Sequence, residues 1–269
     1  MTDTLFAGSI PELYDRLLVP MFFAPYARDL AERVAAANPN DVLETCAGTG
    51  ALTREIAARL AGGARFVATD LNQPMLDQAV ARLSDPRVTP KQADALALPF
   101  ADASFDVVAC QFGVMFFPDK VRGYEEARRV LRPGGSFLFN VWDKLAENEL
   151  ADVVTEALAT MFPGDPPRFM ERTPHGYYDV DRIRDDLARA GLIPVAIEAM
   201  AHTSRAPSAV DAAIAICQGT PLANEIEARD PSGLDGATRC AAEALGRRFG
   251  TGAIEARMRA FIIRADSRP

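Results

Sequence analysis

The stretch that decides the fold runs from Asp41 to Thr53 and reads Asp-Val-Leu-Glu-Thr-Cys-Ala-Gly-Thr-Gly-Ala-Leu-Thr. Its apolar start ends in an acid, Glu44, which is the pattern of a short buried strand. Gly48 and Gly50 then predict a tight turn, because glycine adopts backbone conformations that other residues avoid. A helix pattern follows. A strand, a glycine turn and a helix in this order place the turn at the sheet edge where ligands of α/β proteins bind.

The same alternation continues as far as Trp142 and predicts the fold class. Strand patterns that alternate with helix patterns imply right-handed crossovers and a parallel sheet with helices on both faces. We expect strands at 41–46, 65–70, 87–92, 105–111, 135–142, 192–202 and 254–263. We expect helices at about 50–60, 73–83, 119–131 and 145–162, from Asp179 to Gly191, and through most of 206–249. Asp119 and Asp179 are the predicted N-caps of their helices.

Three segments are predicted along the chain. Residues 1–40 would form N-terminal helices that cover the ligand site, and residues 41–142 would form the ligand-binding core. Residues 143–269 would complete the sheet. Within them, the regular alternation breaks at about 145–177 and 206–249, and we interpret these two parts as cap insertions over the site.

Composition narrows the class of protein. The 269 residues carry a formal net charge of −8, which argues against a nucleic-acid binder. The four cysteines lack paired metal-ligand spacing and are typical of small buried side chains in a reducing compartment. The first residues lack the Lys or Arg with which a signal peptide begins. The apolar stretch from Leu17 to Ala27 is too short to span a bilayer. We expect a cytoplasmic protein without a membrane span.

Acids stand at the ends of three successive predicted strands. Glu44 follows the first, Asp70 the second and Asp94 the third. Each alone is explained as a helix cap or a loop residue. Together they fit a nucleoside, since Asp70 can accept from ribose hydroxyls and Asp94 from an adenine amino group. Because the turn lacks phosphate-cradle spacing, the pattern points to S-adenosylmethionine, which has no phosphate.

Five segments match the motifs of one enzyme family, namely 42–50, 70–76, 94–100, 104–109 and 131–135. On these residues the chain resembles the class I S-adenosylmethionine-dependent methyltransferases, particularly the small-molecule group related to ubiquinone/menaquinone-biosynthesis methyltransferases. The resemblance is strong over about 40–142 and weak elsewhere. One position departs from it, because Cys46 stands where the family has its first glycine. The predicted fold is a Rossmann-like, seven-stranded, mostly parallel sheet with an antiparallel last strand, helices on both faces and a helical cap.

The resemblance also implies roles for particular residues. The amino-acid end of the cofactor would be held by Glu44 and by the backbone of Ala47, Gly48, Thr49 and Gly50. The ribose would bind Asp70, and the adenine would lie against Leu71, Met75, Asp94 and Ala95. Gln111 and Phe112 would lie near the sulfonium, and Tyr14 is the candidate for an aromatic side chain from the N-terminal helix.

The predicted reaction is methyl transfer to a small, hydrophobic or aromatic molecule, with S-adenosylhomocysteine as product. His175 is the candidate catalytic or acceptor-contacting residue, and a structural role for it is the alternative. No metal is expected. The site of methylation (oxygen, nitrogen or carbon) stays open, as does the choice between monomer and homodimer.

Three other functions compete with this prediction. A protein that binds the cofactor without turnover would serve as a partner or regulatory subunit. An NAD-dependent oxidoreductase is disfavoured because Thr53 stands where the dinucleotide fingerprint needs its third small residue. An aminopropyl transferase would need further acids that the sequence does not supply.

Overall fold

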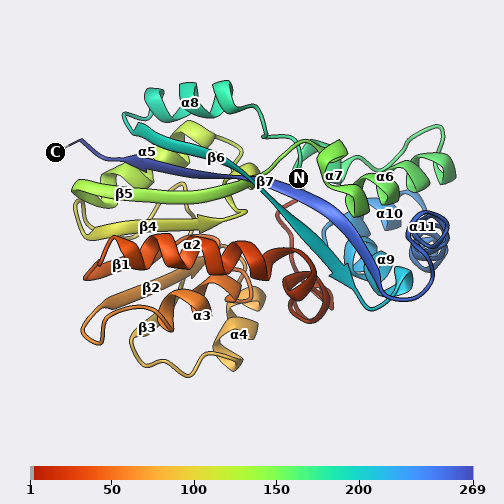
Figure 1. Ribbon diagram of the computed structural model, residues 1–269, viewed down its shortest axis with the longest axis horizontal. Helices are drawn as coiled ribbons and strands as arrows, with labels where there is room; N and C mark the ends of the chain where they lie inside the picture. Colours follow the sequence, from red (N-terminus) through yellow and green to blue (C-terminus); the bar gives the residue numbers. More distant parts are fainter. Residues whose placement is uncertain (1–2, 269) are drawn as a thin grey trace.

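The computed structural model describes residues 3–268, so residues 1–2 and 269 of the predicted terminal segments lie outside it. Seven strands form one sheet in the order β3-β2-β1-β4-β5-β7-β6 (Figure 1). β1 to β5 pair in parallel, while β7 runs antiparallel to both of its neighbours. The predicted fold class is confirmed. The strands are β1 (Asp41–Glu44), β2 (Arg65–Asp70), β3 (Val88–Gln92), β4 (Phe105–Gln111), β5 (Leu131–Trp142), β6 (Ile193–Ala206) and β7 (Ile254–Asp266).

Helices lie around this sheet, and α2 and α3 pack side by side in front of it in Figure 1. Within residues 3–268, no helix is both long enough and apolar enough to cross a membrane. The α-helices are α1 (Ile10–Leu13), α2 (Ala24–Ala36), α3 (Ala51–Ala57), α4 (Gln73–Ala81), α5 (Lys120–Val130), α6 (Glu149–Met161), α7 (Phe169–Arg172), α8 (Val180–Arg189), α9 (Ala209–Gln218), α10 (Leu222–Arg229) and α11 (Leu234–Phe249). The other helical turns are η1 (Tyr14–Phe23), of π type, and the 3₁₀ helices η2 (Val114–Phe116) and η3 (Leu145–Glu147).

Local chemistry explains where these elements begin and end. Asp119 caps α5 by accepting a hydrogen bond from the Arg122 backbone, and Asp179 caps α8 in the same way, as predicted. The first strand is shorter than predicted, because it ends at Glu44. Cys46 has φ +55°, and this left-handed conformation breaks the extended chain two residues later.

The core lies between the sheet and its helices. The middle strands are apolar on both faces, which is typical of parallel strands covered on both sides. Val42, Leu43 and Val108 are fully buried, as is Tyr124 of α5. This packing holds the carboxyl ends of β1, β2 and β4 in fixed register beside one another.

The two last strands extend well beyond the rest of the sheet. β6 and β7 pair along almost their whole length and reach the helices at the right of Figure 1. There α11 packs against α9 and α6, and α10 contacts α7. The segments 145–177 and 206–249 therefore meet in one helical cluster, which we call the cap. α9 of the cap contacts η1 of the N-terminal segment.

Candidate functional site

A cavity of about 540 Å³ lies at the carboxyl ends of the parallel strands, where the topology predicts a ligand site. Its floor comes from the ends of β1, β2, β4 and β5, and its other walls come from the N-terminal segment and the cap. The cavity thus joins three parts of the chain. The floor includes Cys46, Gly48, Asp70, Gln111 and Trp142, and the other walls include Phe6, Tyr14, Phe22, Phe169, His175 and Ile216.

The glycine turn is tied to the end of the second strand. Gly48 and Gly50 have φ of +56° and +80°, in the left-handed region that favours glycine. The Gly48 backbone N–H donates to Asp70 Oδ2 at 2.9 Å, and the Asn72 N–H donates to Asp70 Oδ1 at 2.8 Å. Burial raises the pKa of the Asp70 carboxyl. A carboxylate has about four acceptor positions, so Asp70 keeps acceptor capacity toward the cavity that it lines.

Cys46 fits in the turn because a glycine faces it. A Cβ on Gly113 would lie 2.5 Å from Cys46 Cβ and 2.6 Å from Cys110 Sγ, which is closer than real Cβ contacts. Cys46 has a side chain where the family has a glycine, and this side chain fits because Gly113 opposite it has none. The departure at Cys46 leaves the turn at Gly48 and Gly50 formed.

Most of the residues predicted for the cofactor do line the cavity. These are Tyr14, Gly48, Asp70, Leu71, Met75, Asp94, Ala95, Gln111 and Phe112. Ala47, Thr49 and Gly50 belong to the turn but do not line the cavity. Glu44 does not line it either: its carboxylate accepts a hydrogen bond from Thr53 Oγ1 at 2.7 Å, and burial raises its pKa to about 8. The structure thus gives Glu44 a contact within the loop rather than a place in the cavity wall.

Aromatic side chains surround the region between the turn and the cap. Tyr14 stacks on Phe23 with ring centroids 5.0 Å apart, and Phe112 stacks on Trp142 at 3.9 Å. Phe112 also has φ +49°, and its N–H donates to Asn140 Oδ1 at 2.8 Å. Trp142 was not predicted as a site residue, although its place at the end of a predicted strand was a signal. Phe6, Phe22 and Phe23 carried no such signal.

His175 lies in the loop between α7 and α8, and it lines the cavity. Its Nδ1 is 2.9 Å from the carbonyl oxygen of Asp143. Since a carbonyl only accepts, Nδ1 carries the proton and Nε2 is an acceptor. Burial lowers the pKa of the imidazole to about 4, so the ring is neutral at physiological pH.

Two charged residues of the cavity wall were not predicted from the sequence. Arg172 pairs with Asp3 at 2.7 Å and with Glu225, and so joins the N-terminal segment to two cap helices. The Lys120 ammonium donates to the carbonyl oxygens of Met115 and Phe117 at 2.9 and 2.6 Å. Burial, with a contribution from Arg182, lowers the pKa of Lys120 to about 8. The contacts of Arg172 join distant segments and those of Lys120 are local, but neither set follows a periodic pattern.

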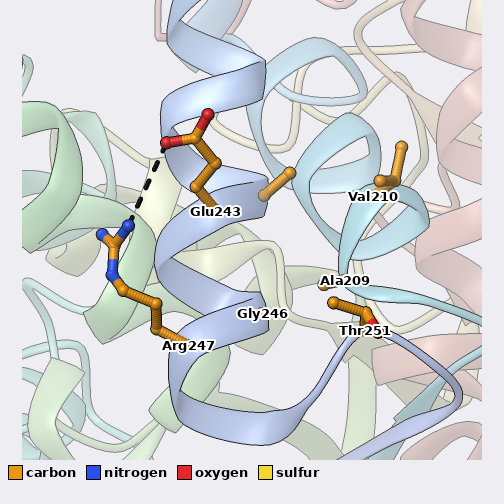
Figure 2. Close-up of a pocket in the computed structure, with 7 residues that line it drawn as sticks. Ala209, Val210, Glu243, Gly246, Arg247 and Thr251 are labelled. Atoms are coloured by element: carbon orange, nitrogen blue, oxygen red, sulfur yellow. Dashed lines mark ion pairs between the residues drawn. The ribbon is translucent and has the colours of Figure 1, made fainter.

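A second cavity, of about 460 Å³, lies on the cap surface between α9 and α11 (Figure 2). Its wall is small side chains such as Ala209 and Ala242, with Val210 exposed at one side. Glu243 and Arg247 point outward on consecutive turns of α11 with an ion-pair distance of 4.0 Å. None of the residues predicted for the site lines this groove.

The core of the chain is similar to one family of known proteins. Residues 42–135 match the model of the methyltransferase domain family. The demethylmenaquinone methyltransferase of Deinococcus radiodurans is 36% identical over 135 residues, which are 49% of this chain and 56% of that protein. The chain therefore matches little more than half the length of this relative. The predicted resemblance to quinone-biosynthesis methyltransferases is confirmed.

Solved structures show the same fold. The BH2331 protein of Bacillus halodurans has a TM-score of 0.59 at 18% identity, covering 90% of this chain and 99% of that one. Phosphoethanolamine N-methyltransferase 2 of Haemonchus contortus, in complex with phosphomonomethylethanolamine and S-adenosylhomocysteine, has a TM-score of 0.56 at 16% identity. It covers 98% of this chain and 61% of its own. At such identities the likeness establishes the class I fold alone.

The packing of Cys46 against Gly113 yields a first prediction. Gly113→Ala places a methyl group within 2.7 Å of Cys46 and Cys110, and the overpacked loop should lose about 1–3 kcal/mol of unfolding free energy. Denaturant unfolding measures this loss. Gly164→Ala is the matched control, since a Cβ there meets nothing within 4 Å. Equal stability of the two variants would contradict the packing described.

The burial of His175 makes stability depend on pH. Its pKa falls from 6.5 in the unfolded chain to about 4 in the folded protein. As pH falls, the unfolded chain binds the proton first, so the stability from neutral His175 is present above pH 6.5 and is lost toward pH 4. The loss is at most about 3 kcal/mol, at ~1.4 kcal/mol per unit. Unfolding of the wild type and of His175→Gln across this interval should give a shallower slope for the variant, and parallel slopes would refute the assignment.

Proposed function

We propose that this protein is an S-adenosylmethionine-dependent methyltransferase that acts on a small, hydrophobic or aromatic molecule. One observation carries the proposal. The turn that the Gly48–Asp70 hydrogen bond fixes opens into the same cavity as an aromatic wall from the N-terminal segment and the cap. A site that only stored the cofactor would have no need of that aromatic wall.

The residues of the floor suit the cofactor. Asp70 would accept from the ribose hydroxyls with its remaining lone pairs, and Leu71 and Met75 would flank the adenine. Asp94 would accept a hydrogen bond from the adenine amino group. Its Oδ1 accepts from the Leu96 N–H at 2.9 Å, and this bond holds the carboxylate in place. Among residues 3–268, the buried Gln111 Oε1 has no hydrogen-bond partner, and it would accept from the cofactor's ammonium group. When bound, the cofactor supplies a methyl group already activated on a sulfonium.

Methyl transfer then requires alignment and the exclusion of water. Orienting two reactants in one cavity can lower the barrier by roughly 7–11 kcal/mol at best. Phe112, held by stacking on Trp142 and by Asn140, would fix one side of the reacting centre. The N-terminal segment and the cap would close the other sides, because Arg172 links them through Asp3 and Glu225.

The acceptor compartment favours a molecule with an apolar or aromatic body. Phe6, Phe116 and Phe169 lie in contact there, with ring centroids 5.8 and 6.3 Å apart in successive pairs. Such faces pack well against flat rings. Neutral His175 would accept a hydrogen bond from a hydroxyl or amine of the acceptor through Nε2 and so orient it. With a pKa of about 4 the ring is a weak base at neutral pH, so this contact would contribute less than the roughly 10²–10⁴ in rate that is typical of general-base catalysis.

The decisive experiment is calorimetric titration with S-adenosylmethionine, S-adenosylhomocysteine and NADH. The proposal expects micromolar dissociation constants for the first two and no heat of binding for NADH, followed by an acceptor screen with labelled methyl donor. Binding of NADH alone would favour the oxidoreductase. Tight cofactor binding without turnover in any screen would favour the silent binding partner.

The role of Asp70 is tested by one substitution. Asp70→Ala removes the ribose acceptor and the partner of Gly48, and should weaken S-adenosylhomocysteine binding by at least tenfold, or about 1.4 kcal/mol. Asp77→Ala, on the exposed face of α4, is the matched control and should bind as the wild type does. An unchanged affinity in Asp70→Ala would mean that the nucleoside lies elsewhere.

A further inference from the structure

Two thiols lie together beneath the cofactor turn. Cys46 follows β1 and lines the cavity, whereas Cys110 is the last but one residue of β4 and is fully buried. The strands bring them together, because the Thr45 N–H donates to the Ala109 carbonyl at 2.9 Å. Both cysteines are free. Neither has a role in the proposed methyl transfer.

The two sulfur atoms are neighbours. The point where a Cβ on Gly113 would stand lies 2.7 Å from Cys46 Sγ and 2.6 Å from Cys110 Sγ. Both sulfur atoms therefore flank the same small space. A disulfide needs the sulfurs at about 2.05 Å, and Gly113 places no side chain between them.

The surroundings of Cys110 favour its thiolate. Burial alone raises the pKa of Cys110, but contacts with the Cys46 and Thr45 side chains and with the Gly113 and Val114 backbone hold this pKa below its usual range. Contact with Cys110 and burial raise the pKa of Cys46 well above its usual value, so the thiolate of the pair stands mainly on Cys110. The thiolate is the form that attacks an oxidised sulfur. Cys46 is the sulfur that a small oxidant reaches from the cavity. The pair thus combines an accessible thiol with a resolving thiolate.

We propose that Cys46 and Cys110 are an oxidation site, which hydrogen peroxide converts to an intramolecular disulfide that closes the cofactor site. The proton of Cys46 first passes to the neighbouring Cys110 sulfur, and the Cys46 thiolate attacks the peroxide to give a sulfenic acid. The hydroxide released in this step takes the proton from Cys110 and leaves as one water. Cys110 then attacks the Cys46 sulfur, and the displaced hydroxide takes up a proton to leave as a second water. The two thiols give up two electrons in total, and the peroxide accepts them.

The disulfide acts on the cofactor through the turn. Cys46 is two residues before Gly48, whose N–H donates to Asp70. Drawing Cys46 onto the end of β4 shifts this donor and crowds Gln111 and Phe112, which follow Cys110 and line the cavity. This consequence rests on the proposed function, while formation of the bond rests on the two cysteines alone.

The test uses the Cys217→Ser, Cys240→Ser double variant, because Cys217 and Cys240 also lie near each other. After treatment with hydrogen peroxide, intact mass should fall by two hydrogen atoms, and peptide mapping should join Cys46 to Cys110. Calorimetry should then show S-adenosylhomocysteine binding weakened by at least about tenfold. Dithiothreitol should restore both the mass and the affinity. Pre-bound S-adenosylhomocysteine should slow the reaction, because it covers Cys46.

Adding Cys110→Ser to this background is the matched control. Without the resolving thiolate, peroxide should add oxygen to Cys46 instead of removing two hydrogens, and circular dichroism checks that the variant is folded. With Cys46→Ser in place of Cys110→Ser, peroxide should likewise fail to remove two hydrogens. Retention of both thiols under peroxide would overturn the oxidation site, and an oxidised protein with undiminished affinity would overturn its effect on the cofactor. A disulfide in a protein that binds no S-adenosylhomocysteine even when reduced would support the site and overturn the proposed function.

Discussion

The hydrogen bond from the Gly48 backbone to the Asp70 carboxylate is the constraint on which the site depends. It joins the turn after β1 to the end of β2, two strands that already pair in parallel. Its geometry requires φ +56° at Gly48 and leaves Asp70 buried at the cavity wall. The carboxylate is costly to bury unless it is hydrogen-bonded. The turn therefore gives the buried Asp70 carboxylate a hydrogen-bond donor, and the same contact fixes the shape of the turn at the cavity.

The remainder of the cavity is built by segments far from this turn. The long pair of β6 and β7 carries the cap helices to the sheet edge, and η1 lies against α9. Contacts within 41–142 thus shape the floor, whereas contacts of the N-terminal segment and the cap shape the aromatic walls.

The sequence predicted the floor better than the walls, for physical reasons. Asp70, Gly48 and Gln111 sit at strand ends, and strand ends follow from periodicity and turn chemistry alone. Glu44 shares that position, yet its carboxylate accepts a hydrogen bond from Thr53, a contact across the turn that periodicity does not predict. Phe6, Lys120 and Arg172 were missed, since their partners lie in other elements and leave no periodic pattern. His175 was found because the chain has two histidines and this one was predicted in a loop.

The ion pair between Asp3 and Arg172 has a practical consequence for handling the protein. It places the start of the described chain against the cavity wall, and Figure 1 shows the N-terminal label beside α7, with the other terminus at the far end of the sheet. Residues fused ahead of Asp3 would emerge next to the opening of the cavity. Residues fused after the last strand would emerge far from it. Affinity tags and surface tethers therefore belong at the C-terminal end.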